Sequence, residues 1–330
     1  MKTCFLHART FARLRPRLKG LEAAVRFVTL DDAGKAHDAG TGTTLDTLPP
    51  LDIAFGNSDA FYSPSVREFM TAILKSPEFD WFQSAAAGIE NPGLMMIGQK
   101  ARRYTTNHTQ SESMAEWALW QALDFLREGP AHRALQAQNK WRRVKAREIR
   151  GSRWLVFGYG SIGQSVGRRV SALGGDVTGV RRSPGPAEGA ARIVAPDTLM
   201  AELPRADVVL LCPPHTPETE NMANADFFAA MAPGALFMNL GRGALVDEAA
   251  LVAALDAGRP AFAALDVTRT EPLPPDSPLW QHPRIVITPH DSSDTPGTVE
   301  GADDTFLANL SRYVAGEPMK HLVDPAAFKT

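Results

Sequence analysis

Cysteine is nearly absent from this chain, which contains two in 330 residues. Cys4 lies inside an apolar run near the start and Cys212 ends another, as small core residues do. The sequence therefore predicts no disulfide framework and favours a reducing compartment, the cytoplasm. The histidines do not gather at metal-ligand spacing, and Cys212 has no C-x-x-C partner, so we expect no metal site.

An excess of one charge is missing as well, since 37 acidic side chains face 35 basic ones. This balance argues against a nucleic-acid partner and against binding to anionic membranes. The N-terminus, MKTCFLHARTFARLRPRL, has no continuous apolar segment of the secretory type, and no run in the chain is long enough for a transmembrane helix. We expect a soluble cytoplasmic protein whose length suits about two domains.

Short apolar runs rich in β-branched residues alternate with helical patterns through the middle of the chain. Each run is apolar at successive positions, as in parallel strands that helices cover on both faces. The runs are Trp154–Phe157, Val177–Val180, Ala206–Cys212, Ala235–Leu240, Ala261–Val267 and Ile285–Thr288. Asp247 before EAALVAALDA and Gly258 after it are start and stop signals for one intervening helix. The pattern predicts a doubly wound α/β sheet.

The first hundred residues repeat this alternation more weakly. TCFLHA, VRFVTL and LDIAFGN predict strands, and residues 64–74 predict a helix, so we expect a second, smaller α/β unit. Two long helical patterns, at residues 113–126 and about 297–315, flank the central sheet and are interpreted as connectors between the units. Ser113 and Glu116 form an S-x-x-E capping box at the start of the first helix.

A G-x-G-x-x-G pattern follows the first central strand and opens a helix. Its glycines are Gly158, Gly160 and Gly163, which serve a tight turn, the approach of a pyrophosphate to the backbone, and close packing of helix on strand. The helix that starts at Ser161 and Ile162 offers N–H groups and a positive dipole end to phosphate. Because the pattern opens a βαβ unit, it predicts a dinucleotide site rather than a glycine turn without a ligand.

Two arginines stand at the tip of the next strand, where an NAD site usually has a carboxylate. Arg181 and Arg182 follow Val180, whereas Asp176 lies at the other end of the strand. Guanidinium groups bind a 2′-phosphate through charge-assisted bonds, and Ser183 offers a further donor. The pattern predicts NADP as the preferred cofactor, with NAD still possible. The alternative is a pair of exposed loop arginines without a ligand.

Three ionisable residues follow three further strands at their carboxyl ends, the edge where open α/β sheets bind ligands. Arg242 follows ALFMNLG, Glu271 follows AFAALDV by a short loop, and His290 follows RIVITP. His290 suits proton donation to the oxygen of a 2-keto acid, because imidazole titrates near neutral pH. Glu271 would favour the imidazolium and orient the ring, and Arg242 would bind the substrate carboxylate or polarise the keto oxygen.

With these motifs in view, the chain resembles the D-isomer-specific 2-hydroxyacid dehydrogenases, and in particular their glyoxylate/hydroxypyruvate reductase-like members. The resemblance runs from about Trp81 onward and rests on VFGYGSIGQSVG, LLCPPHTPET, MNLGRGALVDEAAL, AALDVTRTEPLPPDSPLW and VITPH. It implies that Arg242, Glu271 and His290 are the catalytic residues. It also implies a homodimer whose interface involves the cofactor domains.

The resemblance adds further site residues. Asp266, in ALDV, matches an acid that contacts the nicotinamide carboxamide, and the turn with Pro214 and Thr216 is expected beside the nicotinamide. In QSAAAGIE, the backbone N–H groups near Ala87 and Gly88 are expected to hold the substrate carboxylate, with Arg242 and His290 as the other substrate contacts.

The fold expected is therefore a two-domain α/β protein. A Rossmann-type doubly wound parallel sheet is assigned to residues 104–290, the dinucleotide-binding domain. A smaller flavodoxin-like substrate-binding domain is assigned to residues 1–103 and 291–330.

Two stretches depart from the family pattern. TRT at 268–270 replaces an aromatic-acidic stretch, and HDSSD at 290–294 replaces a more apolar run. Arg269 is interpreted as a surface residue, with a position that reaches the pocket as the alternative. Asp291 either favours the protonated form of the neighbouring His290 or points away as a helix N-cap.

The function expected is the NADPH-dependent reduction of a small 2-keto acid to the D-2-hydroxy acid. A dinucleotide-sensing corepressor on the same fold is the alternative. A formate dehydrogenase is disfavoured, because those relatives pair their histidine with an amide and this chain has Glu271.

Overall fold

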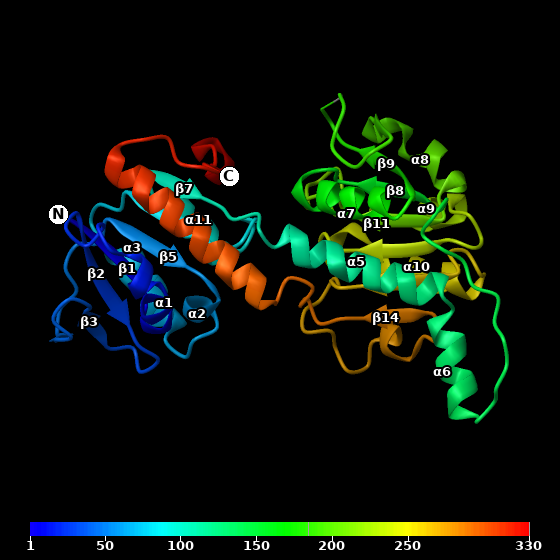
Figure 1. The fold of residues 1–330 in the computed structure, drawn as a ribbon, viewed down its shortest axis with the longest axis horizontal. Coiled ribbons are helices and arrows are strands. Elements are labelled where there is room, and N and C mark those ends of the chain that lie inside the picture. Colours follow the sequence, from blue (N-terminus) through cyan, green and yellow to red (C-terminus); the bar gives the residue numbers. More distant parts are fainter. Residues whose placement is uncertain (184, 330) are drawn as a thin grey trace. The chain divides into compact units, whose positions relative to one another are not determined.

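The computed structural model describes residues 1–183 and 185–329 and divides the chain into two compact units (Figure 1). The first unit comprises Met1–Thr109 and Pro296–Thr330, and the second comprises Gln110–Thr295. Each unit is built on its own sheet.

The first unit contains a sheet of seven strands in the order β4-β3-β2-β1-β5-β6-β7. The strands are β1 Lys2–His7, β2 Val25–Leu30, β3 Ala36–Asp38, β4 Thr44–Leu45, β5 Ile53–Gly56, β6 Trp81–Ser84 and β7 Arg103–Thr105. β3 and β4 are antiparallel additions at one edge, and the other strands are parallel. In chain order the parallel strands follow the 2-1-3-4-5 arrangement of flavodoxin-like folds.

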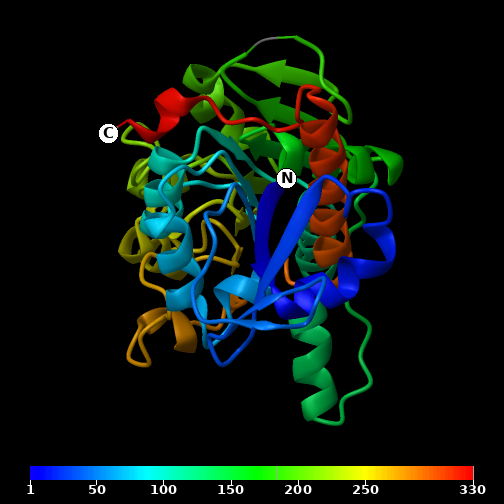
Figure 2. The ribbon, with the colours of Figure 1, turned by 90° about the vertical axis from the view of Figure 1, so that its left-hand side faces the viewer.

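Helices cover both faces of the first sheet (Figure 2). They are α1 Ala8–Leu14, α2 Ser58–Phe61, α3 Val66–Lys75, α4 Pro92–Lys100 and α11 Pro296–Ala315. Figure 2 shows α11, in red to orange, on one side of the blue strands and α3 and α4 on the other. The core agrees, since Phe306 of α11 stacks on Phe55 of β5 with ring centroids 4.4 Å apart, while Phe69 and Ile73 of α3 pack in the cluster on the opposite face.

The second unit contains seven parallel strands in the order β10-β9-β8-β11-β12-β13-β14. They are β8 Arg153–Phe157, β9 Asp176–Val180, β10 Arg192–Val194, β11 Val208–Leu211, β12 Leu236–Asn239, β13 Phe262–Leu265 and β14 Ile285–Ile287. This is the 3-2-1-4-5-6 order of Rossmann folds with one more strand at the end. The predicted fold class is confirmed. The short, partly exposed edge strand β10 was not predicted.

The central strands β8, β11 and β12 of the second sheet are apolar at nearly all successive positions because both faces are covered. Leu155, Val209 and Phe237 face one cluster, while Val156 and Leu210 face the other. The first cluster includes residues of α9 and α10, and the second includes residues of α5 and α7. The helices are α5 Ser111–Leu126, α6 Gly129–Ala137, α7 Ser161–Ala172, α8 Leu199–Glu202, α9 Ala225–Ala230 and α10 Glu248–Asp256.

The division of the chain falls slightly later than the expected limits of 103/104 and 290/291. β7 pairs with β6 of the first sheet, so Tyr104 and Thr105 remain with the first unit. Asp291 and Ser292 donate backbone hydrogen bonds to Asp266, so they remain with the second. The assignment of substrate to one unit and cofactor to the other stays a prediction.

The predicted capping box is wrong. The N-cap of α5 is Gln110, and Ser113 lies inside the first turn, where its hydroxyl donates to the Gln110 carbonyl. Glu116 instead lies 4.0 Å from Arg169 of α7. The helix begins before the apolar stripe from which its start was inferred, a common error at helix ends.

Both cysteine thiols are free, and burial raises the pKa of Cys212 to about 12. Among the described residues, no helix is long and apolar enough to cross a membrane. The same part of the chain contains no group of three or more His, Cys, Asp or Glu side chains placed to hold a metal ion. The cytoplasmic location remains a prediction.

Candidate active site

The carboxyl ends of the parallel strands of the second unit meet at one edge of its sheet. The glycine turn follows β8, the arginines follow β9, and the loops with Arg242, Glu271 and His290 follow β12, β13 and β14. All of these residues therefore belong to one unit and one sheet edge.

The glycine turn has the geometry of a dinucleotide-binding turn. Gly158 has φ +88°, and a Cβ there would lie 2.4 Å from the backbone nitrogen of Pro213. At Gly160 a Cβ would meet no atom within 4 Å, so this backbone is open to a ligand. At Gly163 a Cβ would lie 3.3 Å from Val156 of β8, so helix and strand pack closely. These are the roles that the three glycines need for NAD(P).

The turn leads directly into the start of α7. Gly160 is the N-cap, and Ser161 and Ile162 form the first turn of the helix. A helix start carries partial positive charge, which suits a pyrophosphate. The residues of the turn thus fit a dinucleotide.

The tip of β9 lies against the glycine turn, since the Val180 carbonyl accepts hydrogen bonds from the amides of Gly158 and Tyr159 at 3.0 and 3.1 Å. Arg181 turns back onto its own loop, and its Nε donates to the Ser183 carbonyl at 2.8 Å. Arg182 is exposed. The two predicted arginines are therefore not equivalent: Arg181 shapes the loop, and Arg182 projects from it.

The loop after β11 is compact. The Thr219 hydroxyl accepts from the Thr216 amide at 2.8 Å and donates to the Pro214 carbonyl at 3.0 Å. The pKa of the Glu218 carboxyl lies below its ordinary value, first because Thr216 donates to it and more weakly because Arg182 is near. The predicted residues Pro214, Thr216 and Arg182 thus lie in neighbouring loops.

Arg242 is held by a buried asparagine that the sequence analysis missed. Asn239 is fully buried at the end of β12, where its Nδ2 donates to the Arg242 carbonyl at 2.9 Å and its Oδ1 accepts from the Gly241 amide at 3.0 Å. The guanidinium donates to the Gly241 carbonyl at 2.8 Å. A polar residue in an otherwise apolar strand, directly before G-R-G, was the available signal.

Glu271 and His290 form a direct pair. The Nδ1 atom of His290 lies 2.8 Å from Oε2 of Glu271, and both side chains are partly exposed. The other carboxylate oxygen accepts from the Thr268 amide at 3.2 Å. The structure thus brings together two of the three predicted catalytic residues in hydrogen-bond contact, with Arg242 on the adjacent strand end.

The turn that carries His290 is fixed by Asp266. His290 has φ +56°, a left-handed conformation, and its amide donates to the Asp266 carbonyl at 2.8 Å. The Asp266 side chain is buried, and its carboxylate accepts from the Thr288 hydroxyl at 2.6 Å, from the amides of Asp291 and Ser292, and from the Ser292 hydroxyl. Asp266 therefore holds the histidine turn, and its predicted contact with a nicotinamide carboxamide remains a prediction.

The two predicted substrate-loop residues lie in the first unit. Ala87 and Gly88 follow β6, on a loop whose preceding residue Ala86 accepts a hydrogen bond from the Asn107 amide at 3.1 Å. Asp291 is not an N-cap of α11, because that helix begins at Pro296. The role of Ala87 and Gly88 toward substrate stays a prediction.

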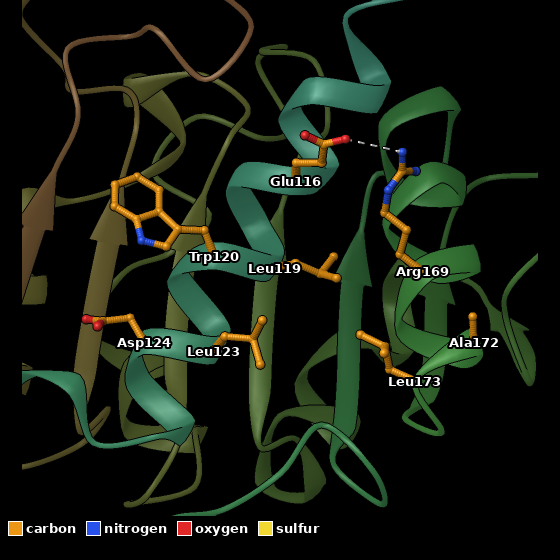
Figure 3. A pocket seen from close by; sticks show the side chains of 8 residues that line it. All are labelled: Glu116, Leu119, Trp120, Leu123, Asp124, Arg169, Ala172 and Leu173. Carbon is orange, nitrogen blue, oxygen red and sulfur yellow. Dashed lines mark ion pairs between the residues drawn. The ribbon is translucent and has the colours of Figure 1, made fainter.

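An open pocket of about 820 Å³ lies elsewhere, between α5 and α7 (Figure 3). It is lined by Glu116, Leu119, Trp120, Leu123, Asp124, Arg169, Ala172 and Leu173. None of the predicted site residues lines it. The pocket is apolar and shallow, which suits a contact surface better than a substrate site.

The family model for the NAD binding domain of D-isomer specific 2-hydroxyacid dehydrogenases matches residues 119–292. This segment contains the glycine turn, both arginines, Arg242, Glu271 and His290. The chain belongs to this family. The predicted class, an NAD(P)-dependent oxidoreductase of the 2-hydroxyacid dehydrogenase type, is confirmed.

Related sequences within this family are named glyoxylate/hydroxypyruvate reductase A. The chain is 35% identical over 214 residues to glyoxylate/hydroxypyruvate reductase A of Serratia proteamaculans, covering 65% of this chain and 68% of that protein. The protein of the same name from Yersinia enterocolitica is 31% identical over 214 residues, with the same coverage.

Solved structures agree along nearly the whole chain. The NADPH-dependent glyoxylate/hydroxypyruvate reductase of Sinorhizobium meliloti, in complex with NADP and sulfate, aligns with a TM-score of 0.79 at 25% identity over 99% of this chain and 100% of that one. A D-isomer specific 2-hydroxyacid dehydrogenase from Xanthobacter autotrophicus, in complex with NADPH and MES, aligns with a TM-score of 0.76 at 28% identity over 99% of each chain.

Proposed function

We propose that this enzyme reduces a small 2-keto acid, of the glyoxylate or hydroxypyruvate type, to the D-2-hydroxy acid with NADPH. In this proposal His290 donates a proton to the keto oxygen. The observation that carries it is the contact of 2.8 Å between Glu271 and His290 at the ligand-binding edge of the second sheet. A partly exposed imidazole beside a carboxylate suits general acid catalysis.

The pairing decides which nitrogen of His290 serves the substrate. An ionised carboxylate only accepts hydrogen bonds, so Nδ1 of His290 carries a proton while it contacts Glu271. Nε2 is then the nitrogen that releases a proton to the keto oxygen. Glu271 also stabilises the charged ring before that transfer, because opposite charges at this distance attract.

Arg242 is assigned to the anionic part of the substrate. Its backbone is fixed by the buried Asn239, so the guanidinium starts from a defined position. A guanidinium binds a carboxylate through charge-assisted hydrogen bonds and also stabilises negative charge developing on a keto oxygen. The contact with the carboxylate favours a 2-keto acid over a neutral ketone, which lacks that group.

The glycine turn and the tip of β9 are assigned to NADPH. The open backbone at Gly160 and the start of α7 suit the pyrophosphate, and Arg182, with Ser183, suits a 2′-phosphate. Two structural neighbours were solved with NADP or NADPH, which supports this choice. The chemistry that a bound NADPH supplies is the transfer of a hydride to the keto carbon.

We also propose that the enzyme is a homodimer in which the face formed by α5 and α7 contacts a second copy. This face exposes Trp120 and Leu123 of α5 and Leu173 of α7 around the pocket in Figure 3. Trp141, after α6 in the same unit, is also fully exposed. Large exposed apolar patches mark interaction surfaces. A Trp120→Glu variant that sediments as a dimer, as the wild type is expected to do, would argue against this face.

The catalytic proposal is tested by following NADPH oxidation with glyoxylate, hydroxypyruvate and longer 2-keto acids, and then repeating the series with NADH. We expect efficient turnover of the small keto acids with NADPH and weaker turnover with NADH. If no 2-keto acid is reduced while NADPH still binds, the corepressor alternative gains support, and a pull-down for protein partners becomes the next step.

A further inference from the structure

Arg269 makes more side-chain contacts at the catalytic edge than its interpretation as a surface residue predicts. Its guanidinium donates to the Glu220 carboxylate at 2.9 Å and to the Asn221 side-chain oxygen, both in the loop after β11. It also donates to the carbonyls of Ala244 and Val246 at 3.1 and 3.2 Å, in the loop after β12. One side chain thus joins the loop after β13 to the two loops before it.

The backbone around Arg269 is fixed from two further directions. The Arg269 amide donates to the Glu248 carboxylate at 2.7 Å, and the preceding amide of Thr268 donates to the carboxylate of Glu271. The loop after β12 touches this segment at Gly243, where a Cβ would lie 2.0 Å from the Thr268 carbonyl carbon. Only glycine permits so close an approach directly after Arg242.

We propose that Arg269 is a positioning residue for the reduction reaction: it holds the loop of Glu271 against the loop of Arg242, so that both meet substrate in a fixed geometry. The inference rests on the proposed function for its effect on turnover. Arg269 itself touches no reacting atom; it acts through Glu271, which contacts His290, and through the loop that begins at Arg242.

The side-chain hydrogen bonds of Arg269 require a guanidinium, because a positive charge alone would not make all of them. Glu220 accepts from Nη1 of Arg269, and the other three acceptors share the two N–H groups of Nη2. A lysine has a single nitrogen and cannot make both sets of contacts. Glu220 also pairs with His215, and its pKa lies below the ordinary value, first because of Arg269 and then because of His215. The network therefore continues into the loop that also carries Thr216.

The first test compares Arg269→Ala and Arg269→Lys with a matched control. We expect kcat to fall roughly tenfold in both variants and KM for the keto acid to rise, because small displacements of reacting groups have effects of this size. Arg192→Ala is the control, since Arg192 is an exposed arginine that pairs with Glu202 in the same unit but away from the site. Wild-type kcat and KM in a folded Arg269→Ala variant would overturn the proposal.

The second test needs no turnover. With selectively ¹⁵N-labelled histidine, we expect His290 to hold its Nδ1 proton in the wild type when the ring is neutral, and to mix both tautomers in Arg269→Ala as Glu271 moves away. An unchanged tautomer in the folded variant would contradict the role of Arg269. If the wild type reduces no keto acid at all, the proposed function fails, and this measurement still decides the role of Arg269.

Asn221→Gly provides a milder variant in case Arg269→Ala does not fold. Asn221 has φ +50°, which glycine adopts readily, so the change removes one acceptor of Arg269 without backbone strain. We expect a smaller fall in kcat than in Arg269→Lys and the same direction of change in the His290 tautomer. No change in either quantity would count against the proposal.

Discussion

The two halves of the ligand-binding edge in the second unit are built differently. After β12, β13 and β14, the loops with Arg242, Glu271 and His290 are held by buried polar side chains, Asn239 and Asp266. After β9, Arg182 is exposed, and the hydrogen bonds described for the Arg181 guanidinium go to carbonyls of its own loop. The edge thus has a half held by buried side chains, here called the rigid half and assigned to the chemistry, and an exposed half, here called the superficial half and assigned to cofactor choice.

This difference suits the role proposed for each half. The proposed proton transfer requires donor and acceptor at a fixed separation, and a buried carboxylate that accepts several hydrogen bonds fixes the histidine turn. Recognition of an extra phosphate requires only a positive group that reaches it, and a solvent-exposed guanidinium suffices. Substitutions in the two halves should therefore affect different kinetic constants.

The largest effect is expected in the rigid half, for His290→Ala. Loss of the proton donor should lower kcat by about a hundred- to ten-thousandfold. The Kd for NADPH, measured by fluorescence, should stay nearly unchanged, because the glycine turn is untouched. His132→Ala, an exposed histidine on α6, is the matched control. A fully active His290→Ala variant would remove His290 from the mechanism.

A smaller effect is expected for Glu271→Gln, which keeps the shape of the partner of His290 but removes its charge. Hydrogen bonds to charged groups contribute about 1.5–3 kcal/mol, so kcat should fall about ten- to a hundredfold. Steady-state kinetics with saturating NADPH measures this loss. A variant that matches the wild type would show that the contact of 2.8 Å serves structure alone.

In the superficial half, Arg182→Ala should change cofactor choice and little else. We expect its KM for NADPH to rise about tenfold, as for loss of one charge-assisted hydrogen bond, with the constants for NADH unchanged. Arg181→Ala should disturb both cofactors, because Arg181 shapes the loop through the Ser183 carbonyl. If the wild type already uses NADH as well as NADPH, the assignment of Arg182 to the 2′-phosphate is wrong.

The smallest effect is expected for Glu112 of α5, which contacts α7, the helix that follows the glycine turn. The Glu112 carboxylate of α5 accepts from Ser165, Arg168 and Arg169 of α7 at 2.8–2.9 Å. Burial of Glu112 opposes its ionisation, but the hydrogen bonds from Arg169 and Ser165 outweigh this and hold its pKa below the ordinary value.

A carboxyl whose pKa is lowered by folding adds stability above its unfolded pKa of about 4.3 and loses it as the pH falls through the folded pKa. Glu112→Gln should therefore lower the free energy of unfolding by about 0.2–1 kcal/mol near neutral pH, the range of exposed ion pairs, and by less in acid. Urea unfolding at both pH values measures this. The control is Glu116→Gln, on the same helix but 4.0 Å from Arg169. A difference that grows in acid would contradict the assignment.

Much of the second unit could be predicted because its strands are covered on both faces. Continuous apolar runs such as Val208–Leu211 leave few alternatives to a parallel strand, and parallel strands place their following loops at one edge. The short strands β3, β4, β7 and β10 could not be predicted, because their two or three residues include polar or charged side chains, whereas the equally short β14, Ile285–Ile287, is apolar throughout.

The polar network of the site was beyond prediction for a different reason. Ser292 and Arg269 act through partners that are distant in sequence, and those partners come together only when the sheet forms. Asn239 differs, because its partners Gly241 and Arg242 follow within three residues, so its polar side chain directly before G-R-G was a usable signal. Arg269 in particular was interpreted as a surface residue, because its local sequence, TRT, gives no sign of acceptors in the loops after β11 and β12.

The most direct test of the central claim, that Glu271 and His290 act as one proton-donating unit, is the single-turnover rate of NADPH oxidation in Glu271→Gln, His290→Ala and the double variant. If the carboxylate works only through the imidazole, the double variant is no slower than His290→Ala alone, because effects within one unit are not additive. If the two losses instead multiply, the two residues act independently, and the claim of a single proton-donating unit is contradicted.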